Sequence, residues 1–397
     1  MEKNRRYLEL DSLRGLAALI VFFSHAVNML VISGDFFNAI NNSVLHIFWD
    51  GSAAVILFFV LSGFVLTLPY VGKDEREPQY FTFIIKRIFR IYPAYFFALL
   101  FSIIIKTFLY NRAGIMEFSQ FVRQFWGWQS GDLTIQSIVK HMIMVGPRYE
   151  MGQIDPIIWS LVVEMKVSIL FPFVILFVKE LRSAKTGIML LLGTILVYKL
   201  SDKALLGRLP FLDENVFHYI SVFVLGALLA KFKEPLIDGV RKMPAFINIS
   251  LFTAGIVFYT GRFSLYDLKL NYSNYNYLIA LGVGIILIYV IALPERFSAL
   301  TWRPVKLLGD ISYSLYLLHF PILMVCTSII YANFRSIKAS YAVSFIICIV
   351  LSYVSFKWIE VPFQRIGRSL ANKLEPLEYS FKNSIPNQRS TRGKELN

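Results

Sequence analysis

The chain has 397 residues, of which 56% are hydrophobic and 17% are charged, and its formal net charge is +14. Soluble globular proteins are about 45–50% apolar and about 25% charged, so this composition excludes a disordered chain, a collagen and an ordinary cytosolic enzyme. We interpret the excess of Lys and Arg as cations of cytoplasmic loops beside a membrane rather than as a nucleic-acid-binding surface.

Apolar segments recur along the whole chain and predict an all-α membrane protein with a bundle of about ten transmembrane helices. One membrane domain is expected over residues 1–374. The polar residues 375–397 are predicted to form a disordered cytoplasmic tail. In chain order, the ten predicted spans are 12–31, 53–71, 91–110, 157–178, 187–200, 216–230, 248–260, 276–293, 311–331 and 340–359.

The distribution of cations predicts the orientation of these helices. With the N-terminus placed in the cytoplasm, the segments on the inner side carry 26 Lys and Arg residues and those on the outer side carry 11. Lys and Arg accumulate in cytoplasmic loops, so both the N-terminus and the C-terminus are predicted to be cytoplasmic.

Several other kinds of site are not predicted. Cys326 and Cys348 both lie in apolar segments and are interpreted as packing residues, so no disulfide framework is expected. With only five histidines, a His-rich metal site is not expected.

Residues 1–11 are polar and the first apolar run lacks a small-residue cleavage site, so this run is expected to remain as a helix.

Ionisable side chains within a span are costly and mark candidate functional sites. Arg14 and His25 lie eleven residues apart in the first span, which places them on one helix face about 16 Å apart along the axis. Taken alone, Arg14 also fits a snorkelling residue at a helix start, and His25 a hydrogen-bonded core histidine. Their shared face favours a joint function, and we expect one continuous cavity lined by both side chains.

Glu164 lies in the fourth span, about 10 Å below its outer end and at a depth similar to that of His25. A carboxylate next to an imidazole raises its basicity and fixes its tautomer. We therefore predict a contact between Glu164 and His25 if the two helices are neighbours. A structural ion pair between Glu164 and an Arg or Lys is the alternative.

Further candidate residues have a plain and a functional interpretation. Arg87 and Arg90, at the start of the third span, fit either positive-inside anchoring or a phosphate clamp, because guanidinium groups bind phosphate in a bidentate manner. His319 precedes Phe320 and Pro321 and is interpreted as a core residue. Glu360, where the last helix meets the cytoplasm, is expected to pair with a loop cation.

Six segments in a fixed order carry a family resemblance. They are LELDSLRGLAALIVFFSHA, AAVILFFVLSGFVL, FTFIIKRIFRIYPAYFF, IIWSLVVE, LGDISYSLYLLHFP and a terminal IEVP. Over about residues 8–365 the chain thereby resembles the acyltransferase-3 family, multi-pass transferases that acylate cell-surface carbohydrates, chiefly in bacteria. The resemblance implies a ten-span helical domain in the cytoplasmic membrane.

The resemblance also implies a reaction. Acyl-CoA, usually acetyl-CoA, is the expected donor on the cytoplasmic side, and a hydroxyl of a polysaccharide or lipid-linked sugar is the expected acceptor. His25 is expected to act as general base or transient acyl carrier, with Glu164 orienting it. The expected substrate-binding residues are Arg14, Arg87, Arg90, Trp159, Ser160, Tyr313 and His319.

Partners and an alternative function follow from the same observations. Some members of the family carry a C-terminal extracytoplasmic esterase-like domain, so this chain is expected to work alone or with a partner such as polysaccharide-synthesis machinery. Intramembrane His, Glu and Arg residues also suit a proton-coupled transporter or flippase of a glycan precursor. Such a transporter would typically contain inverted repeats with paired broken helices, and the sequence has no such symmetry.

Overall fold

In the computed structural model, the described residues are 7–30, 40–72, 77–110, 118–119, 135–144, 154–201 and 214–384. Over these ranges the fold is helical and contains no strand. Seven helices are long and apolar enough to cross a membrane. They are α1 (Leu8–Asn28), α3 (Gly51–Thr67, continued by the 3-10 turn η2, Leu68–Tyr70), α4 (Tyr80–Phe108), α7 (Ile158–Glu180), α14 (Tyr272–Ala292), α15 (Arg303–Phe334) and α16 (Ile337–Ser355), the last as part of a longer helical segment, Ile337–Glu378.

These seven helices correspond to seven of the ten predicted spans, and the helical fold class is confirmed. The other three predicted spans correspond to α8 (Ala184–Leu200), α10 (Glu214–Lys231) and α12 (Ala245–Tyr259). The count of ten membrane crossings and the cytoplasmic placement of both termini stay predictions. Shorter elements complete the described chain: η1 (Val44–Phe48), α6 (Ile135–Met142), α11 (Lys233–Lys242), α13 (Gly261–Ser264), η6 (Tyr266–Leu268), η7 (Pro294–Thr301), the π-helix η8 (Phe356–Glu360) and α17 (Val361–Ser384).

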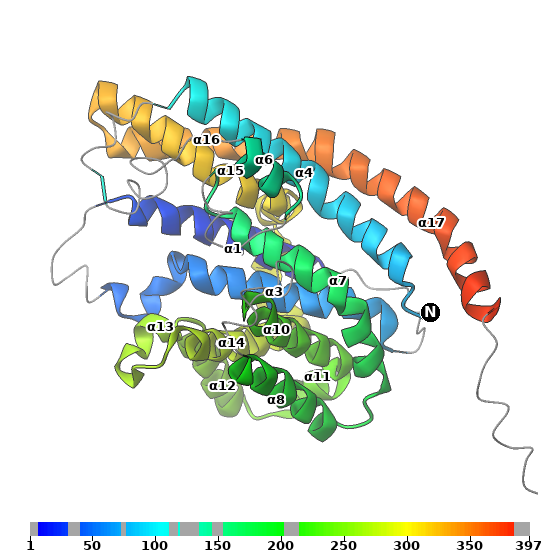
Figure 1. The fold of residues 1–397 in the computed structure, drawn as a ribbon. Coiled ribbons are helices and arrows are strands. Elements are labelled where there is room, and N and C mark those ends of the chain that lie inside the picture. The colour runs from blue at the N-terminus through cyan, green and yellow to red at the C-terminus, as the bar shows by residue number, and fades with distance from the viewer. Residues whose placement is uncertain are drawn as a thin grey trace, which may run out of the picture.

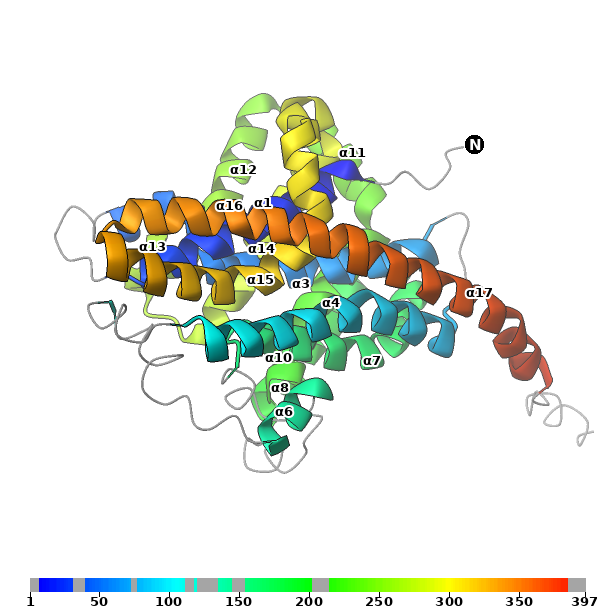
Figure 2. The same ribbon diagram turned by 90° about the horizontal axis from the view of Figure 1, so that it is seen from above.

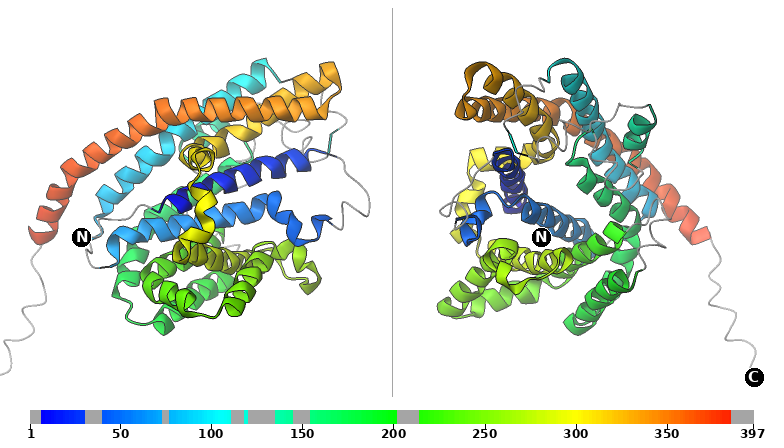
Figure 3. Two further views of the ribbon diagram at one scale, coloured as in Figure 1. Left: turned by 180° about the vertical axis from the view of Figure 1, so that it is seen from behind. Right: turned by 60° about the vertical axis from the view of Figure 1, so that its left-hand side comes forward.

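Helices α1 and α3 lie in the interior of the bundle, between α4, α15, α16 and α17 on one side and α8, α10, α12 and α14 on the other (Figure 1; Figure 3, right). Two close helix crossings hold them there. A Cβ atom on Gly15 of α1 would collide with the backbone at Gly309 of α15, and one on Gly63 of α3 would collide with the backbone at Phe223 of α10. Small residues at such crossings let helices pack closely where lipid gives no hydrophobic driving force.

The start of α3 is fixed by a side-chain cap. The carboxylate oxygen Oδ1 of Asp50 accepts a hydrogen bond from the backbone N–H of Ala53 at 2.9 Å and another from the hydroxyl of Ser52 at 2.8 Å. Such a cap satisfies a backbone donor that the first turn of a helix leaves without a partner. It also holds residues 50–52 at one end of the bundle, beside the C-terminal part of α1.

The C-terminal segment differs from the prediction. Helix α17 continues to Ser384, past the predicted domain boundary at residue 374, and runs beside α4 (Figure 2). The carboxylate of Glu378 accepts hydrogen bonds from the backbone N–H groups of Phe81 and Thr82, both at 3.1 Å. Residues 375–384 are therefore helical in the structure, where a carboxylate at the N-terminus of α4 binds donors that the helix itself cannot satisfy; the domain boundary at residue 374 stays a prediction. The predicted tail residues 385–397 lie outside the described residues.

Candidate functional site

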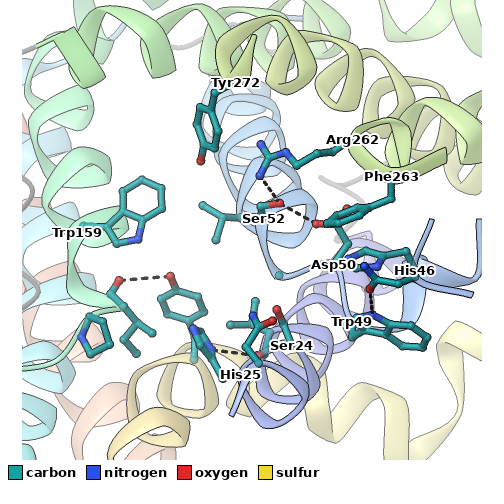
Figure 4. Close-up of a pocket in the computed structure, with 18 residues that line it drawn as sticks. Ser24, His25, His46, Trp49, Asp50, Ser52, Trp159, Arg262, Phe263 and Tyr272 are labelled. Atoms are coloured by element: carbon teal, nitrogen blue, oxygen red, sulfur yellow. Dashed lines mark hydrogen bonds between the residues drawn. The ribbon is translucent and has the colours of Figure 1, made fainter. Parts of the chain in front are cut away.

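Two cavities lie along α1 and meet at a common wall. The first, here called the arginine cavity, has a volume of about 600 Å³ and includes Arg14 in its lining. The second, here called the histidine cavity, has a volume of about 370 Å³ and includes His25 (Figure 4). Val55 of α3 and Tyr316 of α15 line both cavities. Among the described residues, Arg14 and His25 therefore line two adjacent cavities rather than the single continuous cavity that was expected.

Basic side chains dominate the arginine cavity. Five of them line it, against three acidic ones, so the cavity is suited to an anionic ligand. Arg14, Arg87 and Arg90 were predicted to bind substrate, and the fold brings all three together here from α1 and α4. Ser160 and Tyr313, also predicted, line the same cavity.

Acidic residues lie beside two of these guanidinium groups. The Nη1 atom of Arg90 lies 3.7 Å from a carboxylate oxygen of Glu360. The Cζ atom of Arg90 lies 5.8 Å from the ring centre of Tyr313. Glu360 was expected to pair with a loop cation, and it pairs instead with this helical arginine. Arg14 lies 3.5 Å from Asp11, one turn earlier on α1.

Glu164 binds Arg87 and not His25. The Nη2 atom of Arg87 lies 2.6 Å from Oε1 of Glu164, which also accepts a hydrogen bond from the hydroxyl of Ser62 at 3.3 Å. The Nε atom of Arg87 donates to the hydroxyl of Ser168 at 3.1 Å. The predicted Glu164–His25 contact is wrong, because Glu164 lines the arginine cavity while His25 lines the histidine cavity. The alternative, an ion pair between Glu164 and an arginine, is the one that the structure contains.

His25 is held by His319 of α15. Its Nδ1 atom lies 2.9 Å from Nε2 of His319 and 3.1 Å from the carbonyl oxygen of Val21. A carbonyl oxygen can only accept, so Nδ1 of His25 carries the hydrogen. The same reasoning puts a hydrogen on Nδ1 of His319, which lies 2.6 Å from the carbonyl oxygen of Tyr316 and leaves Nε2 as an acceptor. In this neutral tautomer of His25, the lone pair is on Nε2.

His319 is fully buried and is not part of the lining of either cavity. The structure thus supports its interpretation as a core residue, and gives it in addition the position next to His25 that was predicted for Glu164. Sequence spacing could not reveal this pair, because the two histidines lie 294 positions apart. The close crossing of α1 and α15 at Gly15 and Gly309 brings these two helices together.

The wall between the cavities consists of a few side chains. The hydroxyl groups of Ser160 and Tyr316 are 2.6 Å apart, and the hydroxyl of Tyr316 donates to the carbonyl oxygen of Ile157 at 3.3 Å. The ring of Tyr316 packs edge-on against Phe58. Tyr316, together with Val55, thus faces both the space around the arginines and the space around His25.

The histidine cavity contains polar residues that the sequence analysis did not single out. Trp159, which was predicted, lies on one side of it, and Arg262 and Tyr272 enter from α13 and α14 (Figure 4). Asp50 and His46 complete the ionisable part of the lining. Burial raises the pKa of Asp50, and burial together with the nearby charge of Arg262 lowers the pKa of His46 to about 4. His46 is therefore neutral at pH 7.

The arginine cavity also contains residues that were not predicted from the sequence. Lys86, Gln364 and Arg368 line it, the last two from α17. Lys86 lies in the motif that contains Arg87 and could have been found there. Arg368 lies beyond the last predicted span and was counted only as a cytoplasmic cation. No sequence pattern indicates that α17 packs beside α4.

The chain is similar to one family model and to several bacterial O-acetyltransferases. A family model described as "Acyltransferase domain" matches residues 7–357. The peptidoglycan O-acetyltransferase OatA of Listeria monocytogenes is 24% identical over 92% of this chain and 57% of its own length. The O-acetyltransferase OatA of Staphylococcus aureus is 23% identical over 91% of this chain and 58% of its own length. The putative peptidoglycan O-acetyltransferase YrhL of Bacillus subtilis is 23% identical over 94% and 57%.

The chain thus spans a little more than half the length of these curated relatives. No solved structure matches it significantly. The family model nevertheless covers nearly the whole chain, including α1, α4, α7 and α15, which carry the predicted site residues. Together with the seven apolar helices, this match shows that the chain is a multi-pass membrane protein and belongs to the acyltransferase-3 family of membrane-bound acyltransferases.

Proposed function

We propose that this protein transfers an acyl group, an acetyl group by analogy with its relatives, from acyl-CoA to a hydroxyl of a cell-surface glycan at the bacterial cytoplasmic membrane. The observation that carries the proposal is the shared wall between a cation-rich cavity and a cavity that contains His25. Such an arrangement suits a polyanionic donor on one side and an alcohol acceptor on the other. Peptidoglycan is the acceptor named for the Listeria relative and is the first acceptor to test.

In this proposal the arginine cavity binds the donor. Arg14, Arg87 and Arg90 contact the phosphates of CoA, and Lys86 and Arg368 extend the same surface. Glu164 acts as a positioning residue, because its bond to Arg87 fixes the direction of that guanidinium. The cavity volume of about 600 Å³ lies within the range of about 300–1,000 Å³ that is typical of ligand pockets. The thioester reaches His25 when Tyr316 moves from the wall.

The chemistry is centred on Nε2 of His25. This atom accepts the proton of the acceptor hydroxyl, the hydroxyl oxygen forms a bond to the thioester carbonyl carbon, and the carbon–sulfur bond breaks. The proton then passes from His25 to the departing thiolate, so that the products are an ester and free CoA. A two-step route through an acyl-imidazole on Nε2 uses the same atom as nucleophile. In both routes His319 keeps the hydrogen on Nδ1.

A transfer assay tests the proposal. The full chain, purified and reconstituted in liposomes, is given acetyl-CoA with and without peptidoglycan fragments, and both free thiol and acetylated glycan are measured. We expect thiol release that depends on the acceptor and equals the ester formed. A proton-coupled transporter or flippase would release no thiol above background, and that result would contradict the proposal.

Replacing Arg14 with alanine is expected to raise the KM for acetyl-CoA by about 10-fold or more, because a charge-assisted hydrogen bond contributes about 1.5–3 kcal/mol. The kcat should change less, since Arg14 lies on the far side of the common wall from His25. The exposed Arg296 lies outside both cavities, so Arg296→Ala serves as the matched control. An unchanged KM in Arg14→Ala would remove this residue from the donor site.

A further inference from the structure

Arg262 brings a positive charge into the histidine cavity, and among the described residues no carboxylate lies within ion-pair distance of it. Its Nη1 atom donates to the hydroxyl of Ser52 at 2.9 Å and its Nη2 atom to the side-chain oxygen of Asn276 at 2.8 Å. Its Nε atom has no hydrogen-bond partner in the described structure. Both partners are neutral, so they hold the guanidinium in place without compensating its charge.

A second layer of hydrogen bonds fixes this geometry. The amide nitrogen of Asn276 lies 3.1 Å from Nε2 of His218, and Nδ1 of His218 lies 3.0 Å from the hydroxyl of Tyr277. Asn276 donates through its nitrogen to His218, so its oxygen is directed at Arg262. The Cζ atom of Arg262 also lies 4.3 Å from the ring centre of Tyr272. The cation is thus preorganised before any ligand binds.

Two other ionisable groups of the cavity, His46 and Asp50, lie near Arg262. His46 is neutral at pH 7, because its pKa is lowered to about 4. Asp50 also lies near Arg262; burial raises its pKa, while the charge of Arg262 and the hydrogen bonds of the cap lower it. One oxygen of Asp50 is used by the α3 cap, and the other has no hydrogen-bond partner in the described structure. A ligand entering the cavity therefore encounters a guanidinium whose direct hydrogen-bond partners among the described residues are neutral side chains.

We infer that the histidine cavity binds an acidic sugar, whose anionic group, a carboxylate or a phosphate, is bound by Arg262 while a hydroxyl of the sugar is presented to His25. The inference rests on the proposed function, since it assigns this cavity to the acceptor. Arg262 and His25 lie on opposite sides of the cavity, and the aromatic side chains of Trp159 and Tyr272 lie along its wall (Figure 4). Sugar rings pack on aromatic faces, and guanidinium groups bind carboxylate and phosphate as a fork.

Equilibrium binding tests the inference without requiring catalysis. Isothermal titration calorimetry on the full chain in nanodiscs compares two matched pairs of probes. The first pair is a tetrasaccharide of alternating N-acetylglucosamine and glucuronic acid and its methyl ester. The second pair is N-acetylglucosamine 1-phosphate and N-acetylglucosamine. We expect the anionic member of at least one pair to bind about 10- to 100-fold more tightly than the neutral member, and the pair that responds identifies the anion.

Two variants test whether Arg262 is the cause. Arg262→Gln removes the charge, and Asn276→Asp leaves the arginine in place but gives it an anionic partner; both should abolish the preference for the anionic probe. Arg335→Gln alters an exposed arginine outside the cavity and should keep the preference. Equal binding of both members of both pairs by the parent protein, or an unchanged preference in Arg262→Gln, would overturn the inference.

The two proposals can fail separately. A variant with His25→Asn is expected to lose acyl transfer but to keep the preference for the anionic probe, because Arg262 and its partners are intact. If the transfer assay fails for the parent protein and the Arg262-dependent preference remains, the proposed reaction is wrong and the acidic-sugar site stands. If transfer succeeds but no preference is found, the reaction stands and the assignment of Arg262 is wrong.

Discussion

Acyl transfer by His25→Ala is expected to fall by at least about 10²-fold, because the variant loses the group that accepts the hydroxyl proton. His25→Asn is the sharper test. An asparagine amide can place an N–H near the position of Nδ1, and so keep the bonds to Val21 and His319, while it provides no counterpart of Nε2. Both variants should show the same loss in the rate of ester formation, measured under saturating acetyl-CoA.

The same variants separate loss of chemistry from loss of structure. Thermal stability in detergent and the affinity for CoA should be retained in His25→Asn, because the residues of the arginine cavity are untouched. Mass spectrometry of the parent protein incubated with acetyl-CoA and no acceptor distinguishes the two proposed routes. An acetyl adduct on His25 indicates that this residue is an acyl carrier. Absence of the adduct, in a preparation that transfers acetyl groups once acceptor is added, indicates that His25 is a general base. Transfer at the parental rate by His25→Asn would refute both.

Val55→Trp is expected to reduce transfer by at least about 10²-fold while leaving the donor site in place. Val55 lines both cavities, so an indole at this position fills the passage through which the thioester has to reach His25. Misplacing reacting groups by about 1 Å can already cost about 10²-fold in rate, and a blocked passage separates them further. The measurement is ester formation, together with CoA affinity in the same preparation.

Val55→Ala provides the matched control, because it changes the same position and enlarges the passage. This variant should keep most of the transfer activity, although it loses some packing against neighbouring residues. If Val55→Trp keeps its fold and its affinity for CoA but transfers acyl groups at the rate of Val55→Ala, the thioester does not pass the wall formed with Tyr316. The two cavities would then not serve one reaction.

Much of the architecture followed from local properties of the sequence. Long apolar segments must satisfy their backbone hydrogen bonds internally within lipid, and this requirement predicts helices wherever such a segment occurs. The ten predicted segments accordingly correspond to ten helices. The relative position of Arg87 and Arg90 also followed from the sequence, because the helix period alone places them about one turn apart.

What the sequence by itself determined, then, was which residues are functional candidates and how deep each lies in its own helix. The partner of each candidate was decided by the tertiary structure. Helix α1 ends at Asn28 rather than at residue 31. It packs against α15, and His25 therefore contacts His319 and not Glu164. Helix period and hydropathy describe one helix at a time. Which helices become neighbours depends on contacts between distant segments, such as the Gly15–Gly309 crossing, that no local pattern encodes.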